Sequence, residues 1–368
     1  MSYEEVANCQ LQKGQKPLPT NYEKMSKSIF LDTINGQSTS RPPVWFMRQA
    51  GRVLPNYLKL REQHSFTELM HSPRLAAEVT LMPVYDLGVD AAILFSDILV
   101  IPAALGMKLN FTDSGPKFDV ALKELADPAV ILNPDATKLN YIYEAIDEII
   151  RTKPADIPLI GFCGAPFTTL CYMVQGLSSN HTFPDAVALL YKDRKMTHKL
   201  LSAITELSVE YARNQVRHGV SAFQIFETHA GLIPADLYQE VMMPYVRKIA
   251  QAAREEGCPV IFLPKGLGYG IKHILPEDAD FLSIDWQIPI SEARSLVHRD
   301  IGLQGNLDPR LLFADKGTIL ETLEKYVEFG SKEHAWIFNL GHGFMPGIPF
   351  ENAKLVVDWI KKTNWKRG

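Results

Sequence analysis

Eight short apolar runs, spread along the whole chain and separated by longer stretches of helical periodicity, constrain the fold more than any other feature of the sequence. The runs are PVWFM (43–47), AAILFS (91–96), PLIGFCG (158–164), AFQIFET (222–228), PVIFLP (259–264), DFLSIDW (280–286), IGLQGNL (301–307) and AWIFNL (335–340). Their hydrophobicity is continuous and does not alternate, which is typical of strands that crossover helices cover on both faces. The sequence therefore predicts a parallel sheet.

The stretches between the runs have apolar residues at intervals of three and four, as amphipathic helices do. The clearest are residues 139–153, 198–219, 235–257 and 320–330, and the expected C-terminal caps of three of them are Gly219, Gly257 and Gly330. Eight strands alternating with helices predict an α/β fold, a single (β/α)8 TIM barrel with a deep cleft at the carboxyl ends of the strands. An open doubly wound sheet is the alternative, but no G-x-G-x-x-G follows the first run.

The domain organisation follows from length and periodicity. Residues 1–24 are expected to form a loosely ordered arm and residues 25–368 a single catalytic barrel domain, because barrels of this length are common. Residues 108–137 have weak periodicity and are predicted to form a long loop after the second strand.

Composition argues against several classes of partner. The 38 basic and 42 acidic residues give a net charge of −4, whereas nucleic-acid binding needs a basic footprint. The longest apolar region, residues 91–107, is too short for a membrane span and contains Asp97. The N-terminus lacks a secretion signal, and the four cysteines show no C-x-x-C or C-x-x-H spacing. We therefore expect a cytoplasmic protein with reduced thiols and no metal site.

Polar or aromatic side chains lie at the end of each of the eight runs or after it. In a barrel, the loops that leave the carboxyl ends of the strands meet on one face and carry the chemistry. The residues expected there are Arg48, Arg52, Asp97, Tyr172, Glu227, Thr228, His229, Lys265, Asp285, Trp286, Asn306, Asp308 and His342. If the strands are assigned correctly, these side chains surround one cleft.

Two of these positions carry the strongest chemical signal. Arg48 and Arg52 follow a buried run and lie on either side of Gly51, which suits bidentate capture of carboxylates, although ion pairs that close the barrel mouth would use the same residues. Asp97 lies inside an apolar run, where a carboxylate needs a partner. That partner is either an arginine or the N–H groups of a ligand.

The other positions have a structural interpretation beside a functional one. His342, between two glycines, either satisfies a tight turn or contacts a ligand. Lys265 either pairs with a carboxylate or forms a Schiff base, as in aldolases. Tyr172 either packs in the core or donates its hydroxyl to a ligand carboxylate. Asp285 and Asp308 are expected to fix loops.

The motifs at the strand ends resemble those of the uroporphyrinogen decarboxylase family. PVWFMRQAGR matches the family's first signature in full, and GFCGAPFTTLCYMVQG is similar to the second. FSDILVIPAALGM, FETHAG, LQGNLDP and NLGHG follow in the family's order, and the resemblance covers residues 25–363. Four positions depart from the pattern: Asn56 replaces an acidic residue, Thr169 an aliphatic one, Gln175 a glutamate and Thr228 a serine.

The resemblance implies a homodimeric barrel without metal or organic cofactor. It implies removal of CO2 from the four acetate side chains of uroporphyrinogen III, which gives coproporphyrinogen III in haem biosynthesis. Asp97 would accept the four pyrrole N–H bonds and stabilise a cationic ring, and Arg48 and Arg52 would bind the substrate's carboxylates, with Arg48 as a candidate proton donor. The further substrate contacts that it implies are Tyr172, Thr228 and His342 at the rim and Phe46 and Phe226 as apolar walls.

Two other functions share some of these features. A zinc- and cobalamin-linked methyltransferase of the same superfamily would have the same barrel, but no H-x-C follows any predicted strand. A non-catalytic tetrapyrrole-binding barrel would keep the cleft, and the departures at Thr169 and Gln175 leave it open.

Overall fold

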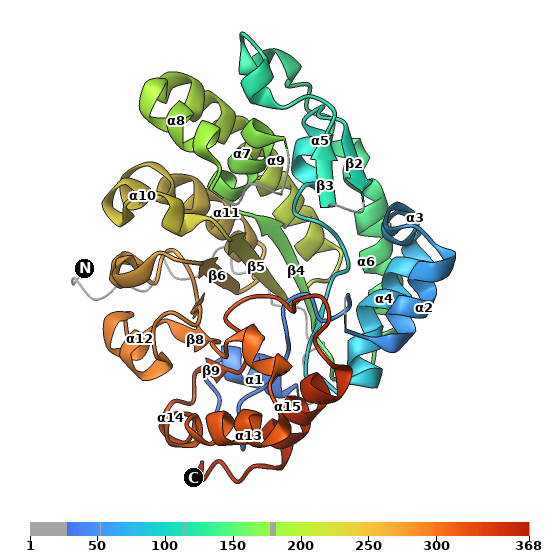
Figure 1. The fold of residues 1–368 in the computed structure, drawn as a ribbon, viewed down its shortest axis with the longest axis vertical. Helices are drawn as coiled ribbons and strands as arrows, with labels where there is room; N and C mark the ends of the chain where they lie inside the picture. Colours follow the sequence, from blue (N-terminus) through green and yellow to red (C-terminus); the bar gives the residue numbers. More distant parts are fainter. Residues whose placement is uncertain (1–27, 52, 113–114, 177–181, 368) are drawn as a thin grey trace, which may run out of the picture.

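The structure is a computed structural model that describes residues 28–51, 53–112, 115–176 and 182–367 (Figure 1). The predicted arm, residues 1–24, lies outside these ranges. None of the helices in the described ranges combines the length and the apolar character needed to cross a bilayer.

Seven parallel strands form a curved sheet in the order β1-β4-β5-β6-β7-β8-β9. Their bounds are β1 Ala92–Ile93, β4 Leu159–Gly164, β5 Ala222–Glu227, β6 Val260–Pro264, β7 Phe281–Ser283, β8 Gly302–Gln304 and β9 Trp336–Ile337. Each strand lies inside one of the predicted apolar runs and pairs with the next one along the chain. The continuous hydrophobic pattern therefore identified the strands.

The remaining apolar run, residues 43–47, bridges the two edges of this sheet. Val44 forms a parallel bridge with Phe338, directly after β9. The Phe338 amide donates to the Pro43 carbonyl at 2.8 Å, and on the other side the Asp90 amide donates to the Val44 carbonyl at 2.8 Å. The first run thus joins the last strand to the first, and the predicted (β/α)8 barrel is confirmed.

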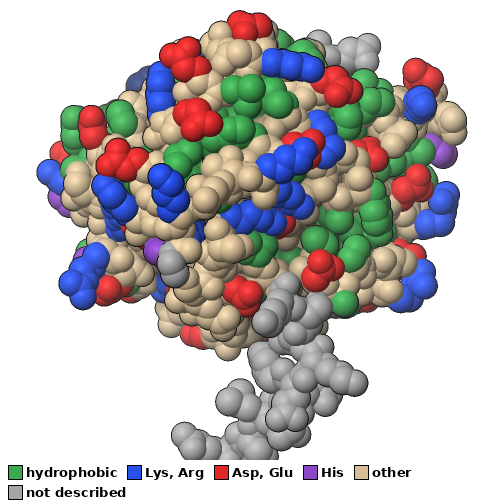
Figure 2. All heavy atoms as spheres, turned by 90° about the horizontal axis from the view of Figure 1, so that it is seen from below, with side chains coloured by type: hydrophobic (Ala, Val, Ile, Leu, Met, Phe, Trp, Pro, Cys, Tyr) green, Lys and Arg blue, Asp and Glu red, His purple; other side chains and the backbone are tan. Residues whose placement is uncertain are grey.

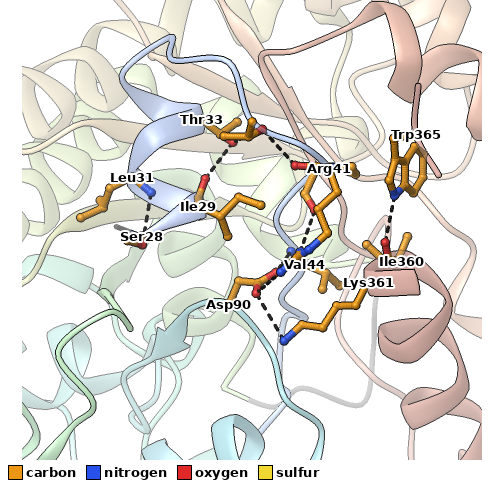
Figure 3. A network of polar contacts seen from close by, with 12 residues as sticks. Ser28, Ile29, Leu31, Thr33, Arg41, Val44, Asp90, Ile360, Lys361 and Trp365 are labelled. Atoms are coloured by element: carbon orange, nitrogen blue, oxygen red, sulfur yellow. Dashed lines mark hydrogen bonds and ion pairs between the residues drawn. The ribbon is translucent and has the colours of Figure 1, made fainter. Parts of the chain in front are cut away.

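An ion-pair cluster reinforces this junction at the amino ends of the strands (Figure 3). The Asp90 side chain is only 8% exposed and accepts two hydrogen bonds from the Arg41 guanidinium, at 2.7 and 2.8 Å. The same carboxylate accepts the Val44 amide at 2.8 Å and lies 3.5 Å from the Lys361 ammonium. Bidentate pairs of this kind hold their partners in a fixed geometry, so the cluster ties the N-terminal segment to the final helix.

The helices form an outer layer around the strands (Figure 1). Their bounds are α1 Ile29–Ile34, α2 Pro55–Gln63, α3 Phe66–His71, α4 Pro73–Asp86, α5 Val100–Ala104, α6 Asn140–Thr152, α7 Pro166–Gln175, α8 Pro184–Lys192, α9 Arg194–Arg217, α10 Ala235–Val241, α11 Met243–Glu255, α12 Ile290–Leu296, α13 Lys316–Glu324, α14 Val327–Lys332 and α15 Phe350–Lys362. The face in Figure 2 mixes basic with acidic side chains and has hydrophobic ones between them, as the small net charge leads one to expect.

Two of the predicted helical stretches are divided. Residues 235–257 form α10 and α11, because Pro244 has no N–H to donate to the preceding turn. Residues 320–330 fall on α13 and α14. Gly219 and Gly257 follow their helices with φ of +109° and +82°, as expected of caps.

The cap predicted at Gly330 is wrong. Gly330 lies inside α14, and a Cβ atom there would be 2.5 Å from the Trp365 ring and 2.7 Å from the Trp336 ring. Glycine is needed at this position because two indoles pack against the helix.

The prediction of a plain loop at residues 108–137 is also wrong. β2 (Leu109–Thr112) and β3 (Gly115–Phe118) form an antiparallel hairpin, and three short 3-10 helices follow, at Leu122–Glu124, Pro128–Ile131 and Ala136–Leu139. The hairpin buries Phe118 but is mostly partly exposed, so it lacks the hydrophobic run by which the barrel strands were recognised.

A hydrogen-bonded layer fills the interior of the barrel. The Trp45 indole donates to Gln304 Oε1 at 3.0 Å, and Gln304 Nε2 donates to Gln224 Oε1 and Ser283 Oγ, each at 3.1 Å. All four side chains are buried. This layer leaves no room for a ligand inside the barrel. We therefore look for the site at the carboxyl ends of the strands.

Candidate active site

Arg48 emerges from the closing run in a backbone conformation that few non-glycine residues adopt, with φ of +59°. The preceding residue is held at both of its main-chain groups: the Met47 amide donates to Asn339 Oδ1 at 3.3 Å, and the Met47 carbonyl accepts from the Phe344 amide at 3.1 Å. The buried Gln49 side chain accepts the Phe46 amide and donates to the Ala91 carbonyl, directly before β1, each at 3.0 Å. The exposed Arg48 side chain is thus set by the backbone, a kind of strain that is common at functional sites.

The loop that carries His342 packs directly against Arg48. A Cβ atom on Gly343 would be 2.5 Å from Arg48 Cδ, and one on Gly341 would be 2.5 Å from the Trp286 amide nitrogen. The two glycines therefore permit close approach on each side of the partly exposed His342. This packing brings the loop after β9 onto the first run.

Asp97 follows β1 and remains partly exposed. Its Oδ1 accepts the Leu99 amide at 2.8 Å, and among the described residues this is the carboxyl's one hydrogen bond, with no ion pair beside it. Burial raises the pKa of Asp97, and the Leu99 N–H and the nearby Arg48 charge oppose that rise. Asp97 is thus a carboxyl in a poorly solvated place that lacks a charged partner in direct contact.

Tyr172 lies on α7 close to both charges. Burial raises its pKa to about 12, with Arg48 lowering and Asp97 raising it. Its ring centre is 5.2 Å from that of Phe183 and 5.5 Å from that of His229. The charges of Arg48 and Asp97 both act on Tyr172, and Arg48 acts on Asp97. The three predicted residues therefore lie close together in one site.

Tyr141 belongs to the same neighbourhood, although sequence reasoning missed it. It lies at the start of α6, partly exposed, with its ring stacked 4.1 Å from that of His71. Burial and the Asp97 carboxylate both raise the pKa of Tyr141. In the sequence it is one apolar position of an amphipathic helix, and nothing there connects it with Asp97.

The end of β5 presents alternate residues to opposite sides. Phe226 and Thr228 are partly exposed, whereas Glu227 between them is fully buried. The Phe226 ring makes an edge contact with the Phe162 ring at 5.6 Å. Because successive strand residues point to opposite faces, Phe226 and Glu227 point to opposite sides of the sheet, and Thr228, the first residue after β5, returns to the partly exposed side.

Two predicted ligand contacts do not gain support. Phe46 was expected to form an apolar wall, but its side chain has no exposed surface and packs against the Phe344 ring at 5.1 Å. The run that contains it is covered on both faces, so the side chain belongs to the core. Arg52 lies outside the described residues.

The strand ends on the other side of the barrel are held by carboxylates. Asp285 accepts the Gly266 amide at 2.6 Å and the Gln287 amide at 2.8 Å. Asp308 accepts the Arg310 amide at 2.9 Å and three bonds from the Arg310 guanidinium group, at 2.9, 3.1 and 2.7 Å. The prediction that these two aspartates fix loops is confirmed.

Lys265 lies over an aromatic ring. Its ammonium is 5.5 Å from the centre of the Trp286 ring, and the Arg310 guanidinium is 5.1 Å from the same ring. The electron-rich face of an indole attracts cations, so both contacts are favourable. Within the described ranges, Lys265 has no ion pair with a carboxylate, and no three His, Cys, Asp or Glu side chains are arranged to hold a metal.

Comparison with known proteins agrees with the motifs. The family profile of uroporphyrinogen decarboxylase (URO-D) matches residues 25–363. The chain belongs to the uroporphyrinogen decarboxylase family. Uroporphyrinogen decarboxylase of Trichlorobacter lovleyi is 38% identical over 90% of this chain and 98% of its own length. That of Geobacter metallireducens is 37% identical over 92% of this chain and 99% of its own.

Solved structures support the fold of this uroporphyrinogen decarboxylase family member. A methyltransferase from Methanosarcina mazei has a TM-score of 0.74 at 18% identity, covering 92% of this chain and 99% of its own. A B12-independent methionine synthase from Shewanella sp. W3-18-1 has a TM-score of 0.55 at 14% identity, covering 80% and 89%. At such identities the likeness concerns the barrel and not the chemistry.

Proposed function

We propose that this protein is an enzyme that removes CO2 from the four acetate side chains of uroporphyrinogen III and so forms coproporphyrinogen III. The observation that supports this most is the placing of Asp97, a poorly solvated carboxyl without a direct ion pair among the described residues, near Arg48 and Tyr172. The substrate carries four inward pyrrole N–H donors and eight carboxylates. One central acceptor surrounded by cationic and hydroxyl groups complements that pattern.

The reaction needs a place for the electrons of the broken bond. Protonation of a pyrrole α-carbon makes the ring cationic, and the C–C bond to the carboxylate can then break with its electron pair moving into the ring. The exocyclic methylene that remains takes up a proton to become a methyl group, and the ring loses the proton it gained. Each acetate therefore exchanges CO2 for one proton.

Asp97 has the central role in this scheme. Its carboxylate accepts the pyrrole N–H bonds and lies next to the positive charge while that charge exists. One well-placed group of this kind lowers a barrier by about 3 kcal/mol. The effect depends on a site with little water, which agrees with the burial that raises the pKa of Asp97.

Arg48, with Arg52 from the sequence motif, binds acetates and propionates of the substrate. A guanidinium group matches a carboxylate with two parallel hydrogen bonds, but it is a weak acid, so binding is the role that we propose for Arg48. Tyr172, Thr228 and His342 bind further carboxylates at the rim. Phe226, partly exposed beside Thr228, forms an apolar wall.

We propose further that two copies of the chain associate through the carboxyl-end rim. Tyr269, Phe313 and Met345 follow β6, β8 and β9 and are 70%, 49% and 37% exposed. A Cβ atom on Gly347 would lie 3.9 Å from the Phe313 ring, so two of the three loops are adjacent. Exposed apolar side chains on one face favour association.

A cytoplasmic location is part of the same proposal. Cys163, Cys171 and Cys258 are buried free thiols, which fits a reducing compartment.

Product analysis with the natural substrate tests the proposed function. The protein is incubated with uroporphyrinogen III under reducing, anaerobic conditions, and the products are separated and weighed. We expect four successive losses of CO2. An unchanged mass with retained binding would instead identify a tetrapyrrole-binding protein.

A metal measurement separates the remaining alternative. Stoichiometric zinc in the purified protein, together with methyl transfer to a thiol, would favour the methyltransferase branch and contradict the proposal.

A further inference from the structure

A buried carboxylate lies directly behind the proposed binding residues of β5. Glu227 is fully buried and points away from the face that Phe226 and Thr228 share. The Tyr238 hydroxyl of α10 donates to Glu227 Oε2 at 3.1 Å, and the Thr168 hydroxyl of α7 makes a short bond to Glu227 Oε1. The side chain thus joins the end of β5 to two helices.

Thr168 passes this connection on to the turn after β5. Its hydroxyl oxygen also accepts the His229 amide at 3.1 Å. A hydroxyl has a single proton to donate. Because the Thr168 hydroxyl donates this proton in its hydrogen bond to Glu227, its lone pairs are free to accept the His229 N–H. The carboxylate thus fixes the orientation of the hydroxyl, and the hydroxyl fixes the turn.

Burying a carboxylate without a cation beside it costs free energy, so this arrangement stabilises the fold poorly. Burial raises the pKa of Glu227 to about 7 although both hydroxyls lower it, and no cation contacts the carboxylate in the part of the chain that the structure describes. Apolar side chains of similar volume fill such a space at least as favourably. This suggests that Glu227 contributes something other than stability.

The two segments that Glu227 joins carry proposed carboxylate-binding groups. Thr168 and Tyr172 are four residues apart on α7, so they lie on the same side of the helix. Thr228 comes directly after Glu227, and the next ring, that of His229, lies 5.5 Å from the Tyr172 ring. A change at the Glu227–Thr168 bond therefore alters the separation of Tyr172 and Thr228.

We propose that Glu227 is a positioning residue, which acts through Thr168 to hold Tyr172 and Thr228 at the separation that matches two carboxylates of the substrate. This role rests on the proposed function, since it assigns both groups to substrate binding. It predicts a loss of substrate affinity and not of the chemical step, because neither Glu227 nor Thr168 touches the reacting atoms.

Steady-state kinetics with uroporphyrinogen on three variants test the role. Glu227→Gln keeps the shape but replaces one acceptor with a donor, and Thr168→Val removes the hydroxyl without a change of volume. We expect KM to rise about tenfold in each, with kcat within about twofold of the parent value. Thr168→Ser restores the hydroxyl and should return KM to within about twofold of the parent.

A matched control separates positioning from general damage. Asp278 is equally buried, in the turn before β7, where it accepts hydrogen bonds from the Arg247 guanidinium at 2.8 Å and the Leu275 amide at 2.9 Å. Asp278→Asn should lower the melting temperature and leave KM unchanged. If Glu227→Gln behaves in the same way, Glu227 is structural and the positioning role is rejected.

A double-mutant cycle distinguishes this role from the proposed function. With Tyr172→Phe in place, Glu227→Gln should raise KM by less than about threefold, because the group that it positions is already gone. Independent, multiplying effects would reject the coupling. If Tyr172→Phe and Thr228→Ala alone leave KM unchanged, the proposed binding site is wrong; if they raise KM and Glu227→Gln does not, only the positioning role fails.

Discussion

Replacing Asp97 with asparagine separates the electrostatic role of this residue from its structural one. Asparagine has the same shape, and its Oδ1 can still accept the Leu99 amide, now 2.8 Å from Asp97 Oδ1. The one property that the change removes is the negative charge. In the proposed mechanism that charge stabilises a transient pyrrole cation.

The expected magnitude follows from Coulomb's law. A carboxylate about 4 Å from a cation contributes about 4 kcal/mol at an effective dielectric constant of about 20. The amide oxygen retains a small part of this as a dipole, so we expect the barrier to rise by about 3 kcal/mol and kcat to fall about a hundredfold.

Stability should change in the opposite direction. Burial raises the pKa of Asp97 in the folded protein, so folding disfavours the ionised carboxylate relative to the unfolded chain. The penalty is absent below the unfolded pKa and complete above the folded one. Asp97→Asn removes it, and the melting temperature at neutral pH should be equal to that of the parent protein or higher.

Anaerobic turnover of uroporphyrinogen III and thermal unfolding, measured on the same preparation, check both expectations. A slow enzyme that is at least as stable as the parent agrees with the reasoning. A kcat within about threefold of the parent would refute the cation-stabilising role. A large fall in melting temperature would show that the carboxylate has a structural partner instead.

Three other perturbations follow from the structure. Arg41→Ala leaves the buried Asp90 without its bidentate partner and should lower the free energy of unfolding by about 3 kcal/mol, measured by urea denaturation. Gly343→Ala places a Cβ atom 2.5 Å from Arg48 Cδ and should raise KM about tenfold by displacing that side chain; an unchanged KM would argue against Arg48 as a substrate contact. The pKa of Glu227 is raised from 4.5 to about 7, so the folded state binds the proton more tightly and stability falls as pH rises through that interval. Across that interval the free energy of unfolding should fall by about 3 kcal/mol in the parent protein and stay constant in Glu227→Gln. Urea denaturation at several pH values measures the difference.

The barrel could be predicted because its strands are covered on both faces. The run 259–264 is apolar at every position and the run 158–164 at nearly every one, and each contains a strand. The same property misled the assignment of Phe46, because a run that is buried on both sides does not show which residues face a ligand. The hairpin β2–β3 was missed for the converse reason, since its strands are mostly half-exposed.

The site could be predicted in part, because Arg48, Asp97 and Tyr172 stand out as polar groups in apolar surroundings. Their mutual proximity depends on barrel closure, which no local pattern contains. Glu227 looked like one more polar residue at a strand end. Its burial follows from the alternation of Phe226, Glu227 and Thr228, but its bond to Thr168 depends on the packing of α7 against β5.

The setting of Arg48 by Asn339, Gly343 and Phe344 has a bearing on how the protein is made. A ribosome exposes residue 48 early in translation, and the parts that shape the backbone around it emerge only when almost the whole chain has been synthesised. Until then the edge of this run that pairs with Phe338 has no partner, and a nascent chain exposes it to chaperones or to other chains. A premature stop codon anywhere before residue 344 therefore yields a product without a working active site, however much of the polypeptide has been completed.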